Sequence, residues 1–331
     1  MKKIFLAFTL LTSVALFCAC QRKEAKAPAP TAKKLGVITT LFPLYDFART
    51  IGGDKADVTL LLPPGVEAHH FDPKPDEIIK IKKADVFVYT NEYMEPWATK
   101  LLKGVATESL LVVDSGKGAK LIEAAPEEEH EGEHGAGGKE SAGHKEEGHH
   151  HHGGGMDPHI WLDFANARIM VDNIAAGMSS KDPANRDYYA IRAAAYKAEL
   201  QKLDDEFKAG LTACGTREFI HGGHNAFGYL TRRYGLTYLP AMHSLMADAE
   251  PSAADLVALV KQMRKNGLKY IYSEELLSPR TAEAIARETG ASVLMLHAAH
   301  NISRDDLAKG VNFISLMKKN LESLRTGLQC R

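Results

Sequence analysis

The sequence predicts an α/β protein of two units, each a parallel β-sheet covered by helices, with one long helix between them. Its 331 residues are too many for one small core and suit two domains of ordinary size. Short apolar runs alternate with helix-like patterns in both halves of the chain, which is typical of parallel sheets whose strands are buried on both faces. A long amphipathic pattern separates the two halves.

The expected strands form two groups of four. The first group is Leu35–Thr39, Val58–Leu62, Val86–Tyr89 and Leu110–Val113, and the second is Glu218–Ile220, Thr237–Leu239, Tyr270–Tyr272 and Val293–Leu296. The helix-like patterns that alternate with them include Pro43–Ile51, Lys74–Lys82, Ala254–Lys265 and Pro279–Glu288.

A single long helix is expected over residues 183–209, between an N-terminal lobe of residues 35–182 and a C-terminal lobe of residues 210–331. Pro183 suits a first helical turn. One apolar stripe follows it at spacings of three or four residues: Tyr189, Ala193, Tyr196, Leu200, Leu203 and Phe207. We interpret this helix, about 39 Å long, as a rigid connection between the lobes. An ordinary helix within one domain would show the same stripe.

The N-terminus has the pattern of an export signal. Two lysines precede an apolar run, residues 4–17, that is too short to span a bilayer and suits a signal peptide over residues 1–19. The run ends in F-C-A-C, which resembles a bacterial lipobox. Cys20 is therefore expected to be the lipidated first residue of a periplasmic, membrane-anchored protein, with ordinary secretion as the alternative. Residues 20–34, rich in Lys, Ala and Pro, are expected to form a flexible tether.

Charge and cysteine content narrow the possible partners and the compartment. The formal net charge is -1, and the sequence has no basic stripe, so no nucleic-acid partner is expected. Cleavage before Cys20 would remove Cys18 and leave Cys214 and Cys330. In an exported protein two such cysteines suggest a disulfide, which would tie the C-terminal tail to the second half of the chain.

Residues 127–153 differ from the rest of the chain. They hold eight Glu, seven His and seven Gly, and no Leu, Ile, Val or aromatic residue, so apolar contacts cannot offset the entropy of ordering them. We expect a disordered loop within the N-terminal lobe. Its histidines are candidates for weak, accessory metal binding: His130, His134, His144, His149, His150, His151 and His152. The alternative is a solvated loop with only incidental affinity for metal.

Most of the other histidines follow the ends of expected strands: His69, His70, His159, His221, His224 and His297. In open α/β sheets, ligands bind beyond the carboxyl ends of the strands, so two sheets facing each other would bring these loops together at a cleft. Imidazole nitrogen suits zinc, copper or nickel, whereas manganese and magnesium favour carboxylates. Neutral imidazoles leave the charge of the ion uncompensated, so carboxylates are expected behind the rings, with Asp157, Asp163, Glu67 and Glu274 as candidates.

Six motifs, in order over roughly residues 35–320, carry a resemblance to a known family. They are L-F-P-L-Y-D-F at 41–47, G-V-E-A-H-H-F-D-P-K-P at 65–75, N-E-Y-M-E-P-W at 91–97, D-P-H-I-W-L-D at 157–163, H-N-A-F-G-Y-L at 224–230 and E-P-S at 250–252. The chain resembles the metal-binding lipoproteins of ABC transporters that serve zinc and manganese uptake, most closely the zinc branch of ZnuA type. The resemblance implies two (β/α)4 lobes joined by a single rigid helix, with the metal in the inter-lobe cleft.

The resemblance also implies the ligands. The first three positions fall on His69, His159 and His224. The fourth, usually Asp in the family, falls on His297, which follows the pair Thr289-Gly290. A three-histidine site completed by water, Glu274 or His300 is the alternative. His70, His221 and His243 are interpreted as non-ligands.

The function implied is capture of Zn²⁺ and its delivery to an ABC permease powered by a separate ATPase, by a monomer that is not an enzyme. The chain has no P-loop signature, so it should not hydrolyse ATP itself. Three alternatives stay open: a manganese-binding homologue, a zinc buffer or adhesin, and a zinc-dependent hydrolase with Glu274 as general base. No H-E-x-x-H motif supports the hydrolase.

Overall fold

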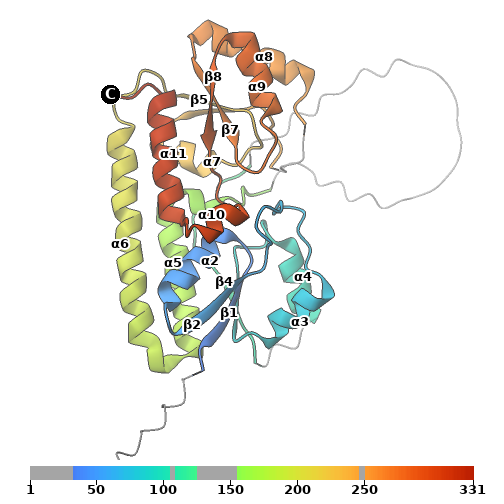
Figure 1. Cartoon of the computed structure of the whole chain (residues 1–331), viewed down its shortest axis with the longest axis vertical. Helices are drawn as coiled ribbons and strands as arrows, with labels where there is room; N and C mark the ends of the chain where they lie inside the picture. Colours follow the sequence, from blue (N-terminus) through green and yellow to red (C-terminus); the bar gives the residue numbers. More distant parts are fainter. Residues whose placement is uncertain (1–32, 105–108, 125–154, 246–249) are drawn as a thin grey trace, which may run out of the picture. The chain divides into compact units, whose positions relative to one another are not determined.

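Two four-stranded parallel sheets organise the protein (Figure 1). The computed structural model describes residues 33–104, 109–124, 155–245 and 250–331, and residues Lys34–Arg331 form one compact unit. The expected signal peptide, Cys20, all of the expected tether but its last two residues and the seven histidines of the acidic tract lie outside the described residues.

The first sheet has the order β2-β1-β3-β4, and the second has the order β6-β5-β7-β8. The strands are β1 (Leu35–Thr39), β2 (Ala56–Leu60), β3 (Val86–Tyr89), β4 (Leu111–Asp114), β5 (Glu218–His221), β6 (Thr237–Pro240), β7 (Tyr270–Glu274) and β8 (Ser292–Leu296). All neighbouring strands pair in parallel. The predicted fold class is therefore confirmed, with β2 starting two residues earlier than expected because Ala56 pairs with Leu35.

The helices include the four expected patterns and several others. They are α2 (Phe42–Gly52), α3 (Pro75–Lys83), α4 (Pro96–Gly104), α5 (Phe164–Lys181), α6 (Arg186–Gly210), α7 (Gly228–Tyr234), α8 (Ala253–Asn266), α9 (Arg280–Thr289), α10 (Arg304–Ala308) and α11 (Phe313–Gly327). Short 3₁₀ turns cover Ile160–Leu162 and Pro183–Asn185. In the residues that the structure describes, no helix is both long and apolar enough to cross a membrane.

Helix α6 is the long helix that the apolar stripe predicts. All six residues of the stripe are buried, and Asp204 is buried with them. The helix begins at Arg186, because the first residues after Pro183 form a 3₁₀ turn instead. It packs against α5, α2 and α11 (Figure 1). It therefore contacts α2 and α5 of the N-terminal lobe and α11 of the C-terminal lobe.

Hydrogen bonds between distant segments hold the two lobes together. Trp161 Nε1 donates to the carbonyl of Ala298 at 2.8 Å. Asn301 Nδ2 donates to the carbonyl of Pro63 at 2.9 Å, and the N–H of Gly65 donates to Ile302 O at the same distance. These bonds fasten the segment after β8 to the turn around Ile160 and to the loop after β2.

Arg233 in α7 joins three elements near the centre of the molecule. Its guanidinium forms a two-pronged contact with Asp204 of α6, with Nε–Oδ1 at 2.7 Å and Nη2–Oδ2 at 2.6 Å. Its Nη1 donates to Asp163 Oδ1 at 2.7 Å, and the same oxygen caps α5 by accepting the N–H of Ala165. Arg233 and its hydrogen bonds hold the pKa of Asp204 down to about 2, against the opposing effect of burial. The long helix is thus tied to α7 and to the start of α5.

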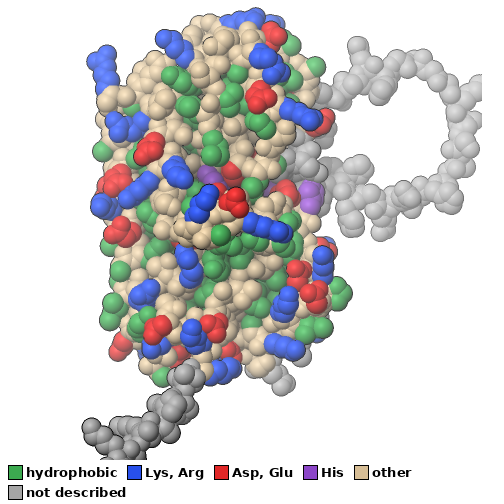
Figure 2. All heavy atoms as spheres, in the orientation of Figure 1, with side chains coloured by type: hydrophobic (Ala, Val, Ile, Leu, Met, Phe, Trp, Pro, Cys, Tyr) green, Lys and Arg blue, Asp and Glu red, His purple; other side chains and the backbone are tan. Residues whose placement is uncertain are grey.

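Charged side chains on the visible face are mixed in sign. Figure 2 shows lysines and arginines beside aspartates and glutamates, with no continuous basic stripe on this face.

A disulfide joins Cys214 to Cys330, the two cysteines considered from the sequence. The two segments also exchange main-chain hydrogen bonds, from Gly215 N to Gln329 O at 3.1 Å and from Arg331 N to Ala213 O at 3.0 Å. The disulfide and these hydrogen bonds therefore join the end of α11 to the segment that follows α6.

Replacing Cys214 and Cys330 together by Ser should lower the free energy of unfolding by about 2–4 kcal/mol, because a crosslink over a long stretch of chain restricts the unfolded state. The sequence separation is 116 residues. Urea unfolding followed by circular dichroism measures the difference. Reductant should destabilise the wild-type protein similarly and leave the double variant unaffected; equal stability of the oxidised wild type and the variant would contradict the expectation.

Candidate metal centre

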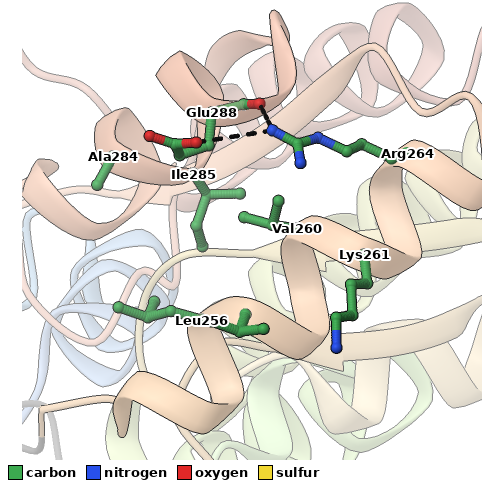
Figure 3. A pocket seen from close by; sticks show the side chains of 8 residues that line it. Leu256, Val260, Lys261, Arg264, Ala284, Ile285 and Glu288 are labelled. Atoms are coloured by element: carbon green, nitrogen blue, oxygen red, sulfur yellow. Dashed lines mark hydrogen bonds and ion pairs between the residues drawn. The ribbon is translucent and has the colours of Figure 1, made fainter.

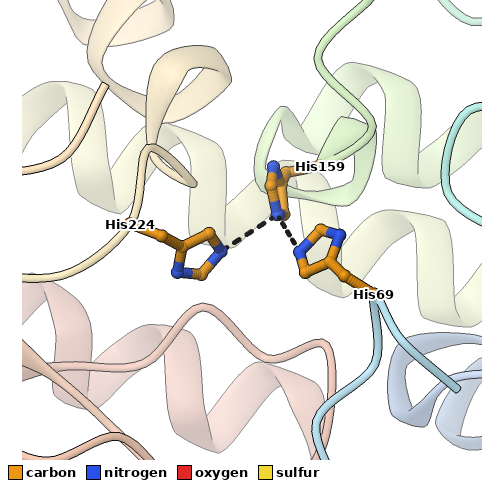
Figure 4. A group of neighbouring side chains, drawn as sticks. All are labelled: His69, His159 and His224. Atoms are coloured by element: carbon orange, nitrogen blue, oxygen red, sulfur yellow. Dashed lines mark hydrogen bonds between the residues drawn. The ribbon is translucent and has the colours of Figure 1, made fainter. Parts of the chain in front are cut away.

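Three histidines from three loops lie side by side (Figure 4). His69 lies in the loop between β2 and α3, His159 immediately precedes the 3₁₀ turn, and His224 lies in the loop between β5 and α7. His159 Nε2 is 3.2 Å from His69 Nε2 and 3.3 Å from His224 Nε2. The structure therefore brings together the three histidines that the sequence favoured as ligands.

The spacing of the three nitrogens suits tetrahedral coordination. Zinc–imidazole bonds of about 2.0–2.1 Å at tetrahedral angles place two ligand nitrogens about 3.3–3.4 Å apart. The separations from His159 Nε2 to the other two nitrogens fall at or just below this range. A single small divalent ion could therefore contact all three rings with little rearrangement.

Buried carboxylates hold two of the rings from behind. His159 Nδ1 is 2.8 Å from Asp157 Oδ1, which also accepts the main-chain N–H of His159 at 2.9 Å. His224 Nδ1 is 2.6 Å from Glu274 Oε2. When both carboxylates are ionised, each Nδ1–H donates outward and the two Nε2 lone pairs face each other. Facing lone pairs at this distance repel unless a proton or a cation lies between them.

Two glycines let the chain after β5 bend into this arrangement. A Cβ on Gly223 would lie 2.7 Å from Glu274 Oε2 and 2.7 Å from His221 Cε1. A Cβ on Gly222 would lie 2.7 Å from the Cβ of Ala282 in α9. His224 can approach Glu274 closely because neither position carries a side chain.

The fourth expected ligand, His297, is not gathered with the other three. The side chain of Asn320 in α11 accepts the main-chain N–H of His297 and donates to the His297 carbonyl, each at 2.8 Å. His297 Nδ1 lies 2.8 Å from Glu275 Oε1. The chain then turns at Ala299, which has a left-handed φ of 64°. This turn carries His300, named from the sequence as an alternative, to the group instead.

His300 faces all three clustered rings. Its ring centroid lies 5.7 Å from that of His224, 6.0 Å from His69 and 6.4 Å from His159. It is 3% exposed, and its Nδ1 has no hydrogen-bond partner among the described residues. The geometry therefore favours His300 over His297 as a fourth ligand.

The remaining candidates have other contacts. Glu67 accepts the main-chain N–H groups of His69 and His70, so it shapes the loop after β2. Asp163 caps α5 and pairs with Arg233, so it supports the fold rather than a ring. Glu275, which was not singled out from the sequence, accepts the N–H groups of Ala298 and Ala299. Only its place beside Glu274 at the end of β7 could have drawn attention to it.

The histidines interpreted as non-ligands differ in burial. His70 and His243 are exposed. His221 is fully buried against Phe219 and Phe227, and neither ring nitrogen has a hydrogen-bond partner in the described structure. Burial lowers its pKa to about 3, so the ring is neutral at physiological pH.

Burial also keeps the clustered imidazoles neutral. It lowers the pKa of His224 to about 4 and that of His300 to about 3. Burial and the adjacent His69 and His224 hold the pKa of His159 well below its usual value. The rings therefore keep lone pairs available for a cation at neutral pH. Burial raises the pKa of Asp157 to about 7, and burial and Glu275 raise that of Glu274.

A second feature, the groove between α8 and α9, has no comparable chemistry (Figure 3). Leu256, Val260 and Ile285 line it, and Arg264 pairs with Glu288 at its edge. The groups of potential metal ligands found in the described part of the chain do not include these residues. The three-histidine centre is therefore the candidate functional site.

The affinity of this centre for a divalent metal should fall as pH decreases from about 8 to 6. A cation on His159 favours ionised Asp157, whereas without a cation Asp157 takes up a proton as the pH falls through about 7. Each proton displaced costs up to about tenfold in affinity per pH unit. Competition titrations at several pH values measure the slope. Asp157→Asn should reduce the slope, and a constant affinity in the wild type would contradict this account.

Comparison with known proteins finds similarity to zinc-binding proteins of uptake systems. A family model described as "Zinc-uptake complex component A periplasmic" matches residues 37–327. The chain is 39% identical over 322 residues to the high-affinity zinc uptake system protein ZnuA of Bacillus subtilis (strain 168), covering 97% of this chain and 96% of that protein. It is 35% identical to the zinc-binding lipoprotein AdcA of Streptococcus pneumoniae (strain ATCC BAA-255 / R6) over 98% of this chain, but spans only 61% of AdcA.

The fold agrees with these sequence matches. The crystal structure of the Zn(II)-bound ZnuA-like domain of Streptococcus pneumoniae AdcA superposes with a TM-score of 0.72 at 32% identity, over 89% of this chain and 99% of that one. The family model covers both sheets and the long helix. From the sequence match and the fold together, the chain belongs to the family of periplasmic zinc-uptake complex component A proteins.

Proposed function

We propose that this protein captures Zn²⁺ at the three-histidine centre and delivers it to an ABC permease powered by a separate ATPase. The observation that carries the proposal is the convergence of His69, His159 and His224 at Nε2 separations of 3.2 and 3.3 Å. The family to which the chain belongs supports the same function, because the B. subtilis relative is named for high-affinity zinc uptake.

The ligand set favours zinc over manganese. Three imidazole nitrogens, with His300 as the proposed fourth, make a nitrogen-rich site, and such sites suit zinc better than manganese. The carboxylates Asp157 and Glu274 accept from Nδ1 of their rings, so they orient the ligands and balance the charge of the ion from a second layer.

The burial of the centre suits retention of an ion rather than catalysis. His159 and His224 are 0% exposed and His69 is half-buried, and a largely buried zinc site whose coordination positions are filled by protein ligands is typical of metal holding. Glu274, considered from the sequence as the base of a hydrolase, uses its Oε2 to hold His224 Nδ1. Members of this family are uptake components, so the chain is a binding protein and not an enzyme.

The anchor, the compartment and the assembly state complete the proposal. Cleavage before Cys20 and its lipidation would hold a periplasmic protein at the membrane surface, close to the permease. AdcA, one of its relatives, is named a lipoprotein. One chain supplies the three clustered histidines, and we propose that it acts as a monomer.

The histidine-rich tract would act separately from the centre. Residues 127–153, which lie outside the described residues, carry seven histidines among eight glutamates. Weak binding by these imidazoles would raise the local zinc concentration near the centre. His130, His134, His144 and His149–His152 are therefore proposed as accessory sites only.

Replacing His69, His159 or His224 by Ala should weaken binding of one tight zinc by more than about 100-fold, because losing a ligand costs more than losing a supporting carboxylate. Titration of the full chain against a competing chelator measures this. His70→Ala and His243→Ala are the matched controls, since both side chains are exposed and should leave the affinity unchanged.

The same variants give a second measurement in cells. The three ligand variants should fail to restore growth in zinc-poor medium to a strain lacking this protein, and the two controls should restore it. Tight zinc binding by all three ligand variants would refute the proposed centre, and tighter binding of manganese than of zinc would refute the proposed cargo.

Deleting residues 127–153 should remove weakly bound zinc and leave one tight zinc, because none of the clustered histidines lies in the tract. Zinc stoichiometry at low and high free zinc, measured on the deletion variant and the full chain, tests this. Loss of the tight ion in the deletion variant would contradict the proposed division between the tract and the centre.

A further inference from the structure

A second group of potential ligands lies beside the three-histidine centre. Glu274, Glu275 and His300 each offer one ligand atom, and these atoms lie within 4.8 Å of one another. The three residues are 6%, 8% and 3% exposed. All come from the C-terminal lobe, two from the end of β7 and one from the segment after β8. The three-histidine centre, in contrast, takes His69 and His159 from the other lobe.

Two buried polar atoms of this group lack partners. Glu274 Oε1 and His300 Nδ1 have no hydrogen-bond partner among the described residues. A buried polar atom without a partner is destabilising, so two within one group call for an explanation. A cation between them would satisfy both atoms at once.

Hydrogen bonds hold the Glu275 carboxylate beside these two atoms. The N–H of Ala298 donates to its Oε2 at 2.8 Å, the N–H of Ala299 donates to its Oε1 at 3.1 Å, and His297 Nδ1 lies 2.8 Å from Oε1. These contacts fix the carboxylate, and an ionised carboxylate has about four lone-pair sites in total. Oε2 therefore keeps a lone pair for a further contact.

The group has the chemistry of a divalent-cation site. Two ionised carboxylates would balance the double charge of one ion, and the imidazole adds a nitrogen ligand. Glu274 also accepts from His224 through Oε2, so the two groups touch through one hydrogen bond at 2.6 Å. The second group is thus adjacent to the first but contains none of its three clustered histidines.

We propose that the divalent cation has a second position in the C-terminal lobe, held by Glu274, Glu275 and His300. The inference rests on the proposed function, since it takes the ion at both positions to be the same cargo. His300 serves both ligand sets, so one ion occupies one position at a time. Phe42 N donates to the carbonyl of His300 at 3.3 Å and Asn301 is bonded to Pro63. These two bonds hold the main chain around His300. We therefore take transfer of the ion between the positions to involve movement of the ion and of side chains only.

The test uses the full chain with His69→Ala and His159→Ala together, which removes the ligands of the N-terminal lobe. Crystals grown with Zn²⁺ are examined by anomalous scattering at the zinc edge. The expected result is one peak in contact with Glu274, Glu275 and His300. Adding Glu275→Gln or His300→Ala should abolish this peak, and adding Glu283→Gln, an exposed glutamate of α9, should leave it unchanged. No peak in the double variant, or a peak on His224 alone, would overturn the proposal.

Glu275→Gln in the otherwise unchanged chain is the control for folding. Its circular-dichroism spectrum and its urea unfolding should match those of the wild type, which shows that the lobe is intact. If the wild-type protein holds no zinc at that centre, the proposed function fails. If the wild type holds zinc there and the double variant shows no second position, only the present inference fails.

Discussion

The contact between His159 and His224, each backed by a buried carboxylate, is the constraint on which the rest of the structure depends. The two Nε2 atoms lie 3.3 Å apart while their Nδ1 atoms are held by Asp157 and Glu274. Such a pair of rings requires loops from both lobes, excluded water and something positive between the lone pairs. The fold provides the loops and excludes the water, and the bound ion provides the positive charge.

The framework around this contact keeps the loops in place before any ion arrives. Helix α6 packs against α2, α5 and α11, and Arg233 ties it through Asp204 to the helix that follows His224. The bond from Trp161 to Ala298 joins the segments that carry His159 and His300. A site held this way needs little ordering on binding, which favours affinity. It also leaves little room for the lobes to open, so release depends on changes within the loops.

The sequence predicted the framework well because its signals are local. All eight strands and the buried stripe of α6 follow from apolar spacing alone. Six candidate histidines follow from their places after strands, and the family resemblance selected His69, His159 and His224 from them as ligands. It placed the fourth ligand on His297, which the structure does not bring to the cluster. His297 and His300 lie three residues apart in a segment without periodicity, and the choice between them depends on Asn320, the turn at Ala299 and the bond from Asn301 to Pro63. These are tertiary contacts that spacing cannot show. The hydrogen bonds from the N–H groups after β8 to Glu275 are also tertiary contacts, so the sequence did not indicate them.

The disulfide between Cys214 and Cys330 links maturation of the protein to its location. It closes only after the chain has left a reducing compartment, and it fastens the last helix to the end of the helix that spans the lobes. The segment before α11 carries His297 and His300, and Asn320 of α11 holds the main chain at His297. The segment that carries the proposed fourth ligand, His300, thus acquires its final support in the compartment to which the protein is exported.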